Sequence, residues 1–159
     1  MKVIKRNQIV EDPVAHLADD APVPETGRFS VSLTRWNAER DALAGTPGLG
    51  LRLNGDDLVD DVVADLDAFD WIALEFPKFS DGRCYSHARV LREHHGYRGE
   101  LRATGDVLRD QLFFMARCGI DVFEVRPDKN IEDALEAFRE FSVTYQPAAD
   151  GRPPVYRRS

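Results

Sequence analysis

Short runs of alternating or continuous hydrophobic residues recur along this chain and are separated by longer stretches with a helical period. Strands are predicted at residues 29–36, 49–53, 71–76, 99–104 and 121–126. The strand at 71–76 ends at Pro77, and the strand at 99–104 is polar enough to lie at the edge of a sheet.

Between these strands, apolar residues recur at the spacing of one helix face. Helices are predicted at residues 37–43, 56–69, 85–95 and 106–118, and from residue 130 onward. Gly96 and Gly119 stand where a helix commonly ends, and Asp106 and Asn130 are suitable N-caps.

Strands that alternate with helices indicate an α/β fold with a mostly parallel sheet and right-handed crossovers. About four βα units follow residue 49. An open, doubly wound sheet is the first choice for their arrangement, and a half-barrel-like arrangement is the second.

The chain of 159 residues is long enough for one domain with its own core, which we assign to residues 29–146. Proline, glycine and aspartate interrupt every pattern in residues 1–28, so we expect an irregular N-terminal arm that lies on the domain or on a partner. Residues 147–159 are rich in proline, glycine and charge, and we expect an exposed, flexible C-terminal tail.

The net charge of −7, from 21 basic and 28 acidic residues, argues against nucleic acid or an anionic membrane surface as the main partner. No run approaches the ~20 apolar residues of a membrane span. Polar residues follow the basic start, where a signal peptide would be apolar, so we expect a cytoplasmic protein. Two cysteines fit a reducing compartment and are too few for a zinc or iron–sulfur site within this chain.

Ligands of parallel sheets bind at the carboxyl ends of the strands. Loops leave such ends after Phe76, Thr104 and Arg126. Their charged residues could converge on one functional rim made of Lys78, Asp81, Arg83, Asp106, Arg109 and Asp110. Arginine forks and helix amino termini suit sulfite, sulfate or phosphate. The alternative is a structural role in turns, helix caps and surface ion pairs.

No cofactor is evident from motifs, because the chain contains neither the GxGxxG fingerprint nor a GxxxxGK[ST] loop. This absence leaves FMN open, since its sites lack a single strict motif. Three histidines, His87, His94 and His95, fall in one predicted helix without the spacing of metal ligands, so a polar helix surface is favoured over a metal site.

The two cysteines receive different interpretations. Cys118 follows the apolar stripe of its helix and is expected in the core. Cys84 stands beside the cationic Arg83, so a reactive thiol is an alternative to a structural one. The adjacent Phe113 and Phe114 are both expected in the core, because aromatic residues form much of a small core.

Much of the chain resembles a bacterial family of unknown function. The resemblance rests on residues 76–83, 85–86, 88, 91–92, 99–103, 105–108, 110–112, 117–119 and 145–146. Members are typically encoded beside the haemoprotein of assimilatory sulfite reductase and are labelled oxidoreductases of sulfite reduction. The label comes from neighbouring genes, so the resemblance implies a place in sulfur assimilation and cysteine biosynthesis and carries over no catalytic residue. Relatives often have glycine at the position of Cys84, which weakens the case that the family requires a thiol at this position.

Three functions remain open at this point. The first is an accessory protein that acts with the sulfite reductase haemoprotein through docking, electron delivery or assembly, since charge can steer an acidic protein to a basic face. The second is a small oxidoreductase or oxyanion-handling enzyme, with Arg83 and Arg109 on the anion and Asp81 or Asp106 as general acid or base. The third is a sulfur-metabolite sensor that binds at the same rim without turnover.

Overall fold

The structure is a computed structural model that describes residues 1–77 and 82–144, with side chains as far as residue 140. Its strands are β1 (Lys2–Lys5), β2 (Gln8–Glu11), β3 (Val14–His16), β4 (Arg28–Ser32), β5 (Leu49–Leu53), β6 (Trp71–Phe76), β7 (Glu100–Gly105) and β8 (Val122–Phe123). Its α-helices are α1 (Leu33–Leu43), α2 (Arg83–Arg89), α3 (Leu112–Arg117) and α4 (Ile131–Thr144). Short 3-10 helices are η1 (Val59–Asp61), η2 (Val63–Ala68) and η4 (Arg109–Gln111), and η3 (Val90–His94) is a π-helical turn.

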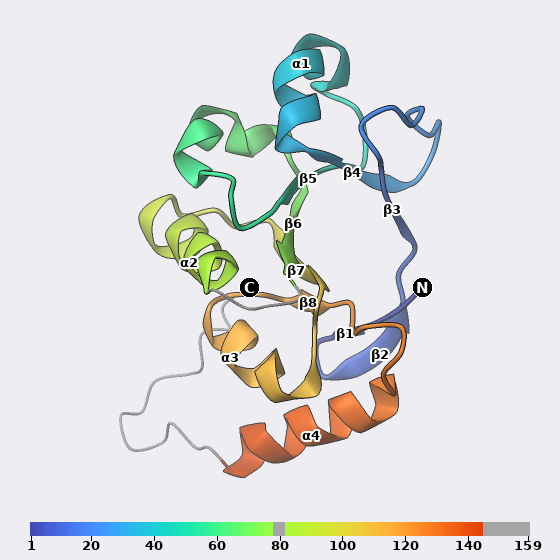
Figure 1. The fold of residues 1–159 in the computed structure, drawn as a ribbon, viewed down its shortest axis with the longest axis vertical. Coiled ribbons are helices and arrows are strands. Elements are labelled where there is room, and N and C mark those ends of the chain that lie inside the picture. The colour runs from blue at the N-terminus through green and yellow to red at the C-terminus, as the bar shows by residue number, and fades with distance from the viewer. Residues whose placement is uncertain (78–81, 145–159) are drawn as a thin grey trace.

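The strands form one eight-stranded, mostly parallel sheet in the order β2-β1-β8-β7-β6-β5-β4-β3. Strands β3 to β8 run parallel, and β1 pairs antiparallel with β2 and β8. From β3 to β8 each strand is added on the same side of the last, so right-handed crossovers place the helices on one face. Figure 1 shows α2 and α3 on one side of the strands and the N-terminal segment on the other. The half-barrel arrangement is therefore confirmed, and the doubly wound one, which needs a reversal of strand order, is wrong.

The core lies between the sheet and its helices. Leu51, Ile72 and Leu101 are partners in register on β5, β6 and β7, and all three are fully buried. Trp36 of α1 is also buried and packs edge-on against Phe69, with ring centroids 4.8 Å apart. The strands at 49–53 and 71–76 have the predicted bounds, because their apolar runs are long enough to define them.

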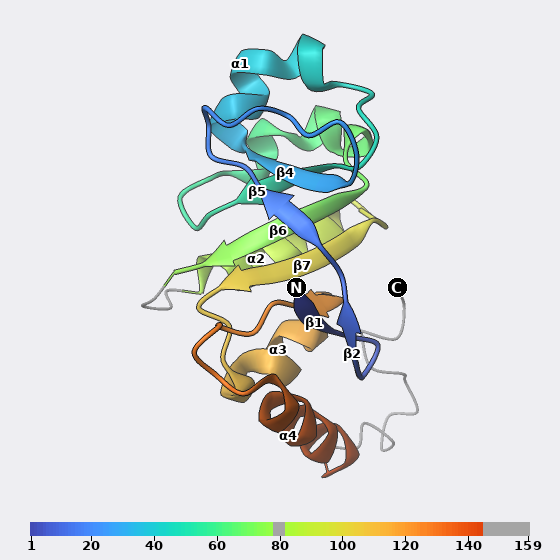
Figure 2. The same cartoon turned by 90° about the vertical axis from the view of Figure 1, so that its right-hand side faces the viewer.

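Residues 1–28 contain three strands, which corrects the expectation of an irregular arm. The hairpin of β1 and β2 extends the sheet at β8, and β3 extends it at β4 (Figure 2). Strands of three or four residues are too short to show alternation, so the prolines around them dominated the pattern. This segment is part of the sheet.

The N-terminal segment also shows how strongly the sheet is curled. Strands β2 and β3 stand at opposite ends of the strand order, yet only Asp12 and Pro13 separate them. A flat sheet of this size would place its outer strands roughly 30 Å apart, whereas this connection spans only about 10 Å. The two edges of the half-barrel must therefore approach each other, and the segment closes its concave side.

The predicted helix at 56–69 is instead the pair of short 3-10 helices η1 and η2. Residues 56–70 contain seven aspartates and no lysine or arginine. Aspartate is a poor helix former, and like charges four residues apart repel each other on an α-helix. Val59, Val62 and Leu66 reach the core, whereas Leu58 and Val63 are exposed, so the helix type was wrong and the hydrophobic spacing was only partly correct.

Several element boundaries also differ from the predicted ones. The strand at 29–36 stops at Ser32, whose Oγ accepts a hydrogen bond of 3.1 Å from the Arg35 amide and caps α1. Strand β7 lies between β6 and β8, so it is not at an edge. Asn130 caps α4 as predicted, because its Oδ1 accepts from the Asp133 amide at 2.8 Å.

Candidate functional site

An open cleft of about 760 Å³ lies at the carboxyl ends of the central strands. Its lining comes from the ends of β5, β6 and β7, the start of α2 and the segment after β8, and comprises Asn54, Gly55, Asp56, Glu75, Phe76, Pro77, Arg83, Gly105, Asp106 and Arg126. This is the position at which open parallel sheets bind their ligands. The cleft is therefore the first candidate site.

Carboxylates already neutralise the two arginines of this cleft. Arg126 pairs with Asp106 at 2.9 Å and with Asp128 at 2.7 Å, and Arg83 pairs with Asp56 at 2.7 Å. The hydrogen bond from Arg126 is the main reason that the pKa of Asp128 lies below its ordinary value. These pairs leave little positive charge for an oxyanion.

Among the described residues that line the cleft, Glu75 is the charged side chain without an ion-pair partner. Its side chain is exposed, and among the described residues it makes no hydrogen bond or ion pair. The described lining thus holds three carboxylates, those of Asp56, Glu75 and Asp106, against two guanidinium groups. A lone carboxylate at a strand end can act as a general acid or base, so this cleft suits proton transfer better than anion binding.

The structure divides the predicted rim. Arg83 and Asp106 line the strand-end cleft, whereas Arg109 and Asp110 line a different pocket. Lys78 and Asp81 lie outside the described residues. Asp106 does not cap a helix as predicted, because the chain stays extended at Leu108 and the next helical turn, η4, begins only at residue 109. Its carboxylate holds Arg126 instead.

The second pocket, of about 690 Å³, lies among α2, η4, α3 and α4. It is lined by Arg89, Arg109, Asp110, Phe113, Phe114, Arg117, Ala137 and Phe138. Phe114 is 49% exposed, so the expectation that it belongs to the core is wrong. The buried face of the short helix α3 is formed by Leu112, Met115 and Ala116, which turns Phe114 toward solvent.

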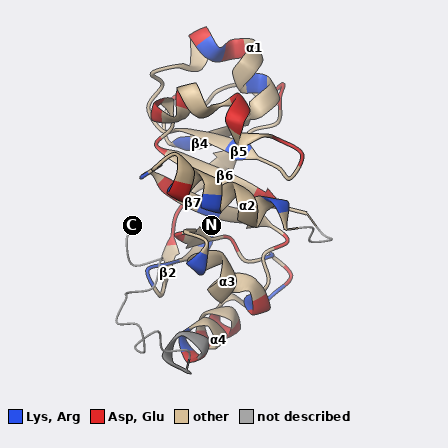
Figure 3. Ribbon diagram, turned by 90° about the vertical axis from the view of Figure 1, so that its left-hand side faces the viewer, with Lys and Arg blue, Asp and Glu red and all other residues tan. Residues whose placement is uncertain are grey.

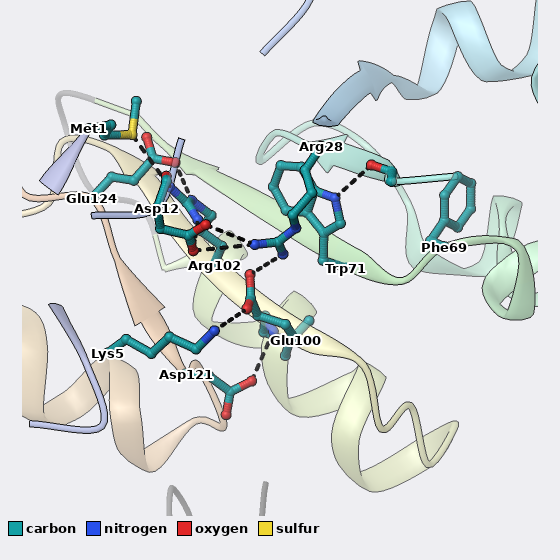
Figure 4. Close-up of polar contacts among 12 residues, drawn as sticks. Met1, Lys5, Asp12, Arg28, Phe69, Trp71, Glu100, Arg102, Asp121 and Glu124 are labelled. Carbon is teal, nitrogen blue, oxygen red and sulfur yellow. Dashed lines mark hydrogen bonds and ion pairs between the residues drawn. The ribbon is translucent and has the colours of Figure 1, made fainter. Parts of the chain in front are cut away.

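A buried polar cluster fills the concave side of the half-barrel (Figure 4). Arg102 of β7 is fully buried, hydrogen-bonds Glu124 through Nε and binds Asp12 through Nη1 at 2.9 Å. Arg28 also binds Asp12, at 3.1 Å, and binds Glu100 at 2.7 Å. The sequence analysis did not predict this cluster. The only signal was the alternation of polar residues at positions 100, 102 and 104, and these side chains point into the barrel and not toward solvent.

His16 joins this cluster to the opposite edge of the sheet. Its Nε2 lies 2.8 Å from Glu124 Oε2, and its Nδ1 lies 2.7 Å from Ser30 Oγ, which also accepts from Arg52 at 3.0 Å. The acid–histidine–serine order is that of a nucleophilic relay. However, Ser30 is completely buried, so its hydroxyl cannot reach a substrate and the chain of bonds is structural.

Burial acts to raise the pKa of Glu124, but hydrogen bonds from His16 and Arg102 outweigh it and hold that pKa below its ordinary value. A depressed pKa stabilises the fold above the unfolded-state value of about 4.3, and the gain is lost as pH falls through the folded-state pKa. We therefore expect the free energy of unfolding, measured with urea, to fall below about pH 4.3.

The control for this pH dependence is a matched pair of variants. Glu124→Gln should flatten the acid limb of the stability profile, whereas Glu136→Gln, on an exposed position of α4, should leave it unchanged. An unaltered acid limb in Glu124→Gln would show that other carboxylates govern the acid sensitivity.

Both cysteines are buried, so neither is presented to solvent as a thiol. Cys84 donates to the Glu75 carbonyl at 3.2 Å, and burial raises the pKa of Cys118, which lies in the core as predicted. His87 is also buried and lies 3.0 Å from the Asn54 carbonyl oxygen, which corrects its placement on the helix surface. Within residues 1–77 and 82–144 no group of three or more His, Cys, Asp or Glu residues could hold a metal ion.

The comparisons with known proteins identify a family without a function. Among the described helices none is long and apolar enough to cross a membrane. No curated protein matches the chain. A family described as a bacterial protein of unknown function, DUF934, matches residues 50–156, a span that includes the lining of both pockets. The chain belongs to the DUF934 family.

Proposed function

We propose that this protein is an accessory protein of assimilatory sulfite reduction that docks on the sulfite reductase haemoprotein. The resemblance described above supplies the partner. The observation that carries the proposal is an acidic surface with exposed aliphatic side chains on η1, on η2 and on the two residues before η1. This aspartate surface consists of Asp57, Leu58, Asp60, Asp61, Val63 and Asp67.

The aspartate surface joins charge to exposed apolar area. Leu58 is 60% exposed and Val63 is 38% exposed, although both are large aliphatic residues. Figure 3 shows acidic segments following β5 on the face that carries the helices. Exposed apolar side chains within a charged surface are typical of a protein-binding site, in which the apolar groups supply affinity and the charges supply the rim.

The sign of the charge selects the class of partner. Within residues 56–70 Asp56 pairs with Arg83 and Asp65 pairs with Arg40, but the exposed Asp61 and Asp67 have no ion-pair partner among the described residues, so the surface keeps a negative charge and its own repulsion. The same surface on a second copy would add to that repulsion. A basic face of a redox partner would instead be attracted and steered into place, which supports docking on the haemoprotein.

The test is co-elution of the full chain with the haemoprotein of the same organism in size-exclusion chromatography, followed by a binding titration at two salt concentrations. We expect a colourless protein that co-elutes with the haemoprotein and binds it more weakly as salt rises. The charge-reversal variant Asp60→Lys/Asp61→Lys should raise the dissociation constant at least about tenfold.

The matched control is Asp20→Lys/Glu25→Lys, which makes the same change in net charge at exposed residues away from η1 and η2. It should change the dissociation constant less than about threefold, because its charges lie outside the contact. Separate elution of the two wild-type proteins would overturn the proposal, and equal loss in both variants would overturn the aspartate surface as its site.

A second candidate function is supported by the lone Glu75 in the strand-end cleft. In that case the chain is a small enzyme of sulfur assimilation in which Glu75 transfers a proton. Elution apart from the haemoprotein, together with turnover of a sulfur compound that Glu75→Gln abolishes, would favour this candidate. Binding of a sulfur oxyanion without turnover would instead favour the sensor.

A further inference from the structure

The pocket among α2, η4, α3 and α4 carries a charge opposite to that of the whole protein. Its lining holds three arginines, Arg89, Arg109 and Arg117, against Asp110, whereas the chain as a whole has a net charge of −7. From this pocket we infer that the protein has a binding site for a planar aromatic molecule that carries a phosphate group.

The aromatic preference follows from the walls of the pocket. Phe113, Phe114 and Phe138 contribute rings to the lining, and Phe114 is half-exposed there. Phe114 is held edge-on by Tyr85, with ring centroids 4.8 Å apart, and Tyr85 in turn packs on Phe76 at 5.0 Å. A ring fixed in this way presents its free area to a ligand at little cost in conformational entropy, and stacking on it favours a planar partner.

The anion preference follows from Arg89. Its guanidinium lies 5.9 Å from the Phe114 ring centre, and its Nε donates to the Cys118 sulfur at 3.4 Å. A thiol is a weak acceptor, and among the described residues neither Nη group of Arg89 makes a hydrogen bond and no carboxylate lies within ion-pair distance. Paired Nη donors beside an aromatic face match the oxygens of a phosphate.

The other two arginines line the pocket together with its phenylalanines and add less to its positive charge than Arg89 does. Arg109 is about half exposed, but it pairs with Asp133 at 2.7 Å and with Asp110 at 3.7 Å, so the anion contact rests on Arg89. Arg117 lies 5.9 Å from the Phe113 ring centre. A positively charged pocket attracts an anionic occupant. The residues beyond position 144 are themselves basic, with Arg152, Arg157 and Arg158 against one aspartate, so their charge does not complement that of the pocket.

The size of the pocket favours a small molecule over a protein segment. A volume of about 690 Å³ lies within the range of sites for small molecules and cofactors. The pocket shares no residue with the aspartate surface, so the inference stands or fails independently of docking.

Two matched pairs of probes test the site on the full chain: FMN against riboflavin by flavin fluorescence, and adenosine 5′-phosphate against adenosine by calorimetry. Each pair shares a ring system and differs in the phosphate. We expect at least one phosphate probe to bind with a dissociation constant below about 1 mM and its phosphate-free partner to bind at least about tenfold more weakly.

Variants connect that difference to named side chains. Arg89→Gln should weaken the phosphate probe about tenfold and leave its phosphate-free partner nearly unchanged, because only the anion contact is lost. Phe114→Ala should weaken both probes of a pair. Arg98→Gln, at an exposed arginine away from the pocket, should weaken neither. Both substituted residues of the site are exposed, so the urea midpoints should stay close to that of the wild type.

The inference is overturned if neither phosphate probe binds below about 1 mM, if the phosphate makes no difference, or if Arg89→Gln binds as tightly as the wild type. Binding of polyglutamate without binding of either phosphate probe would also overturn it and would assign the pocket to an acidic protein partner.

Discussion

Replacement of Arg102 by methionine is expected to lower the free energy of unfolding by about 3–5 kcal/mol. Arg102 is fully buried and is the shared partner of Glu124 and Asp12, two carboxylates that lie on segments far apart in the chain. Methionine fills much of the same space but removes the cation that the two carboxylates share, which leaves Asp12 with Arg28 and Glu124 with His16 as their remaining partners. Removal of one partner from a buried ion pair is costly because the remaining charge has lost its solvation.

Urea unfolding of the full chain measures this effect, with Arg98→Met as the control. Arg98 is an exposed arginine, and its replacement should change the free energy of unfolding by less than about 0.5 kcal/mol. The double variant Arg102→Met/Glu124→Gln should recover part of the loss, because it removes one of the two carboxylates that have lost Arg102. If Arg102→Met cost less than about 1 kcal/mol, the cluster would not be what holds the N-terminal segment on the sheet.

The second large effect is expected for Arg92→Leu, which should lower the free energy of unfolding by about 3 kcal/mol. The Arg92 side chain lies in η3 and connects two loops: it donates to the carbonyls of Tyr97, Gly99 and Gly119 at 2.7, 2.8 and 3.0 Å, and to the Asp121 carboxylate at 2.6 Å. Leucine has no donors, so these partly buried acceptors lose their partner together.

The conservative variant Arg92→Lys separates charge from geometry. Lysine keeps the positive charge but has a single ammonium group, which cannot reach four acceptors as the planar guanidinium does. We expect Arg92→Lys to recover less than half of the stability lost in Arg92→Leu, while Arg98→Leu stays close to the wild type. Urea unfolding decides the matter, and a fully stable Arg92→Lys would show that only the charge near Asp121 is needed.

The candidate sites were only partly predictable. Arg83 and Asp106 do lie at the carboxyl ends of parallel strands, because the position of a strand end follows from the pattern of the strand itself. Arg109 and Asp110 belong to another pocket, since the chain after Asp106 stays extended before η4 begins. No local signal indicated that Phe114 would be exposed, because its surroundings depend on where α4 packs.

The sequence by itself determined the α/β class, the bounds of β5 and β6 and the cap of α4 at Asn130, because these features depend on neighbouring residues and on a local hydrophobic period. The tertiary structure decided the curl of the sheet, the strands within residues 1–28 and the burial of Arg102. Asp12 and Arg102 are 90 residues apart in the chain, so their ion pair leaves no pattern within any local window. An arginine in a strand is usually exposed, and here only the closing of the barrel over it supplied the carboxylates that allow its burial.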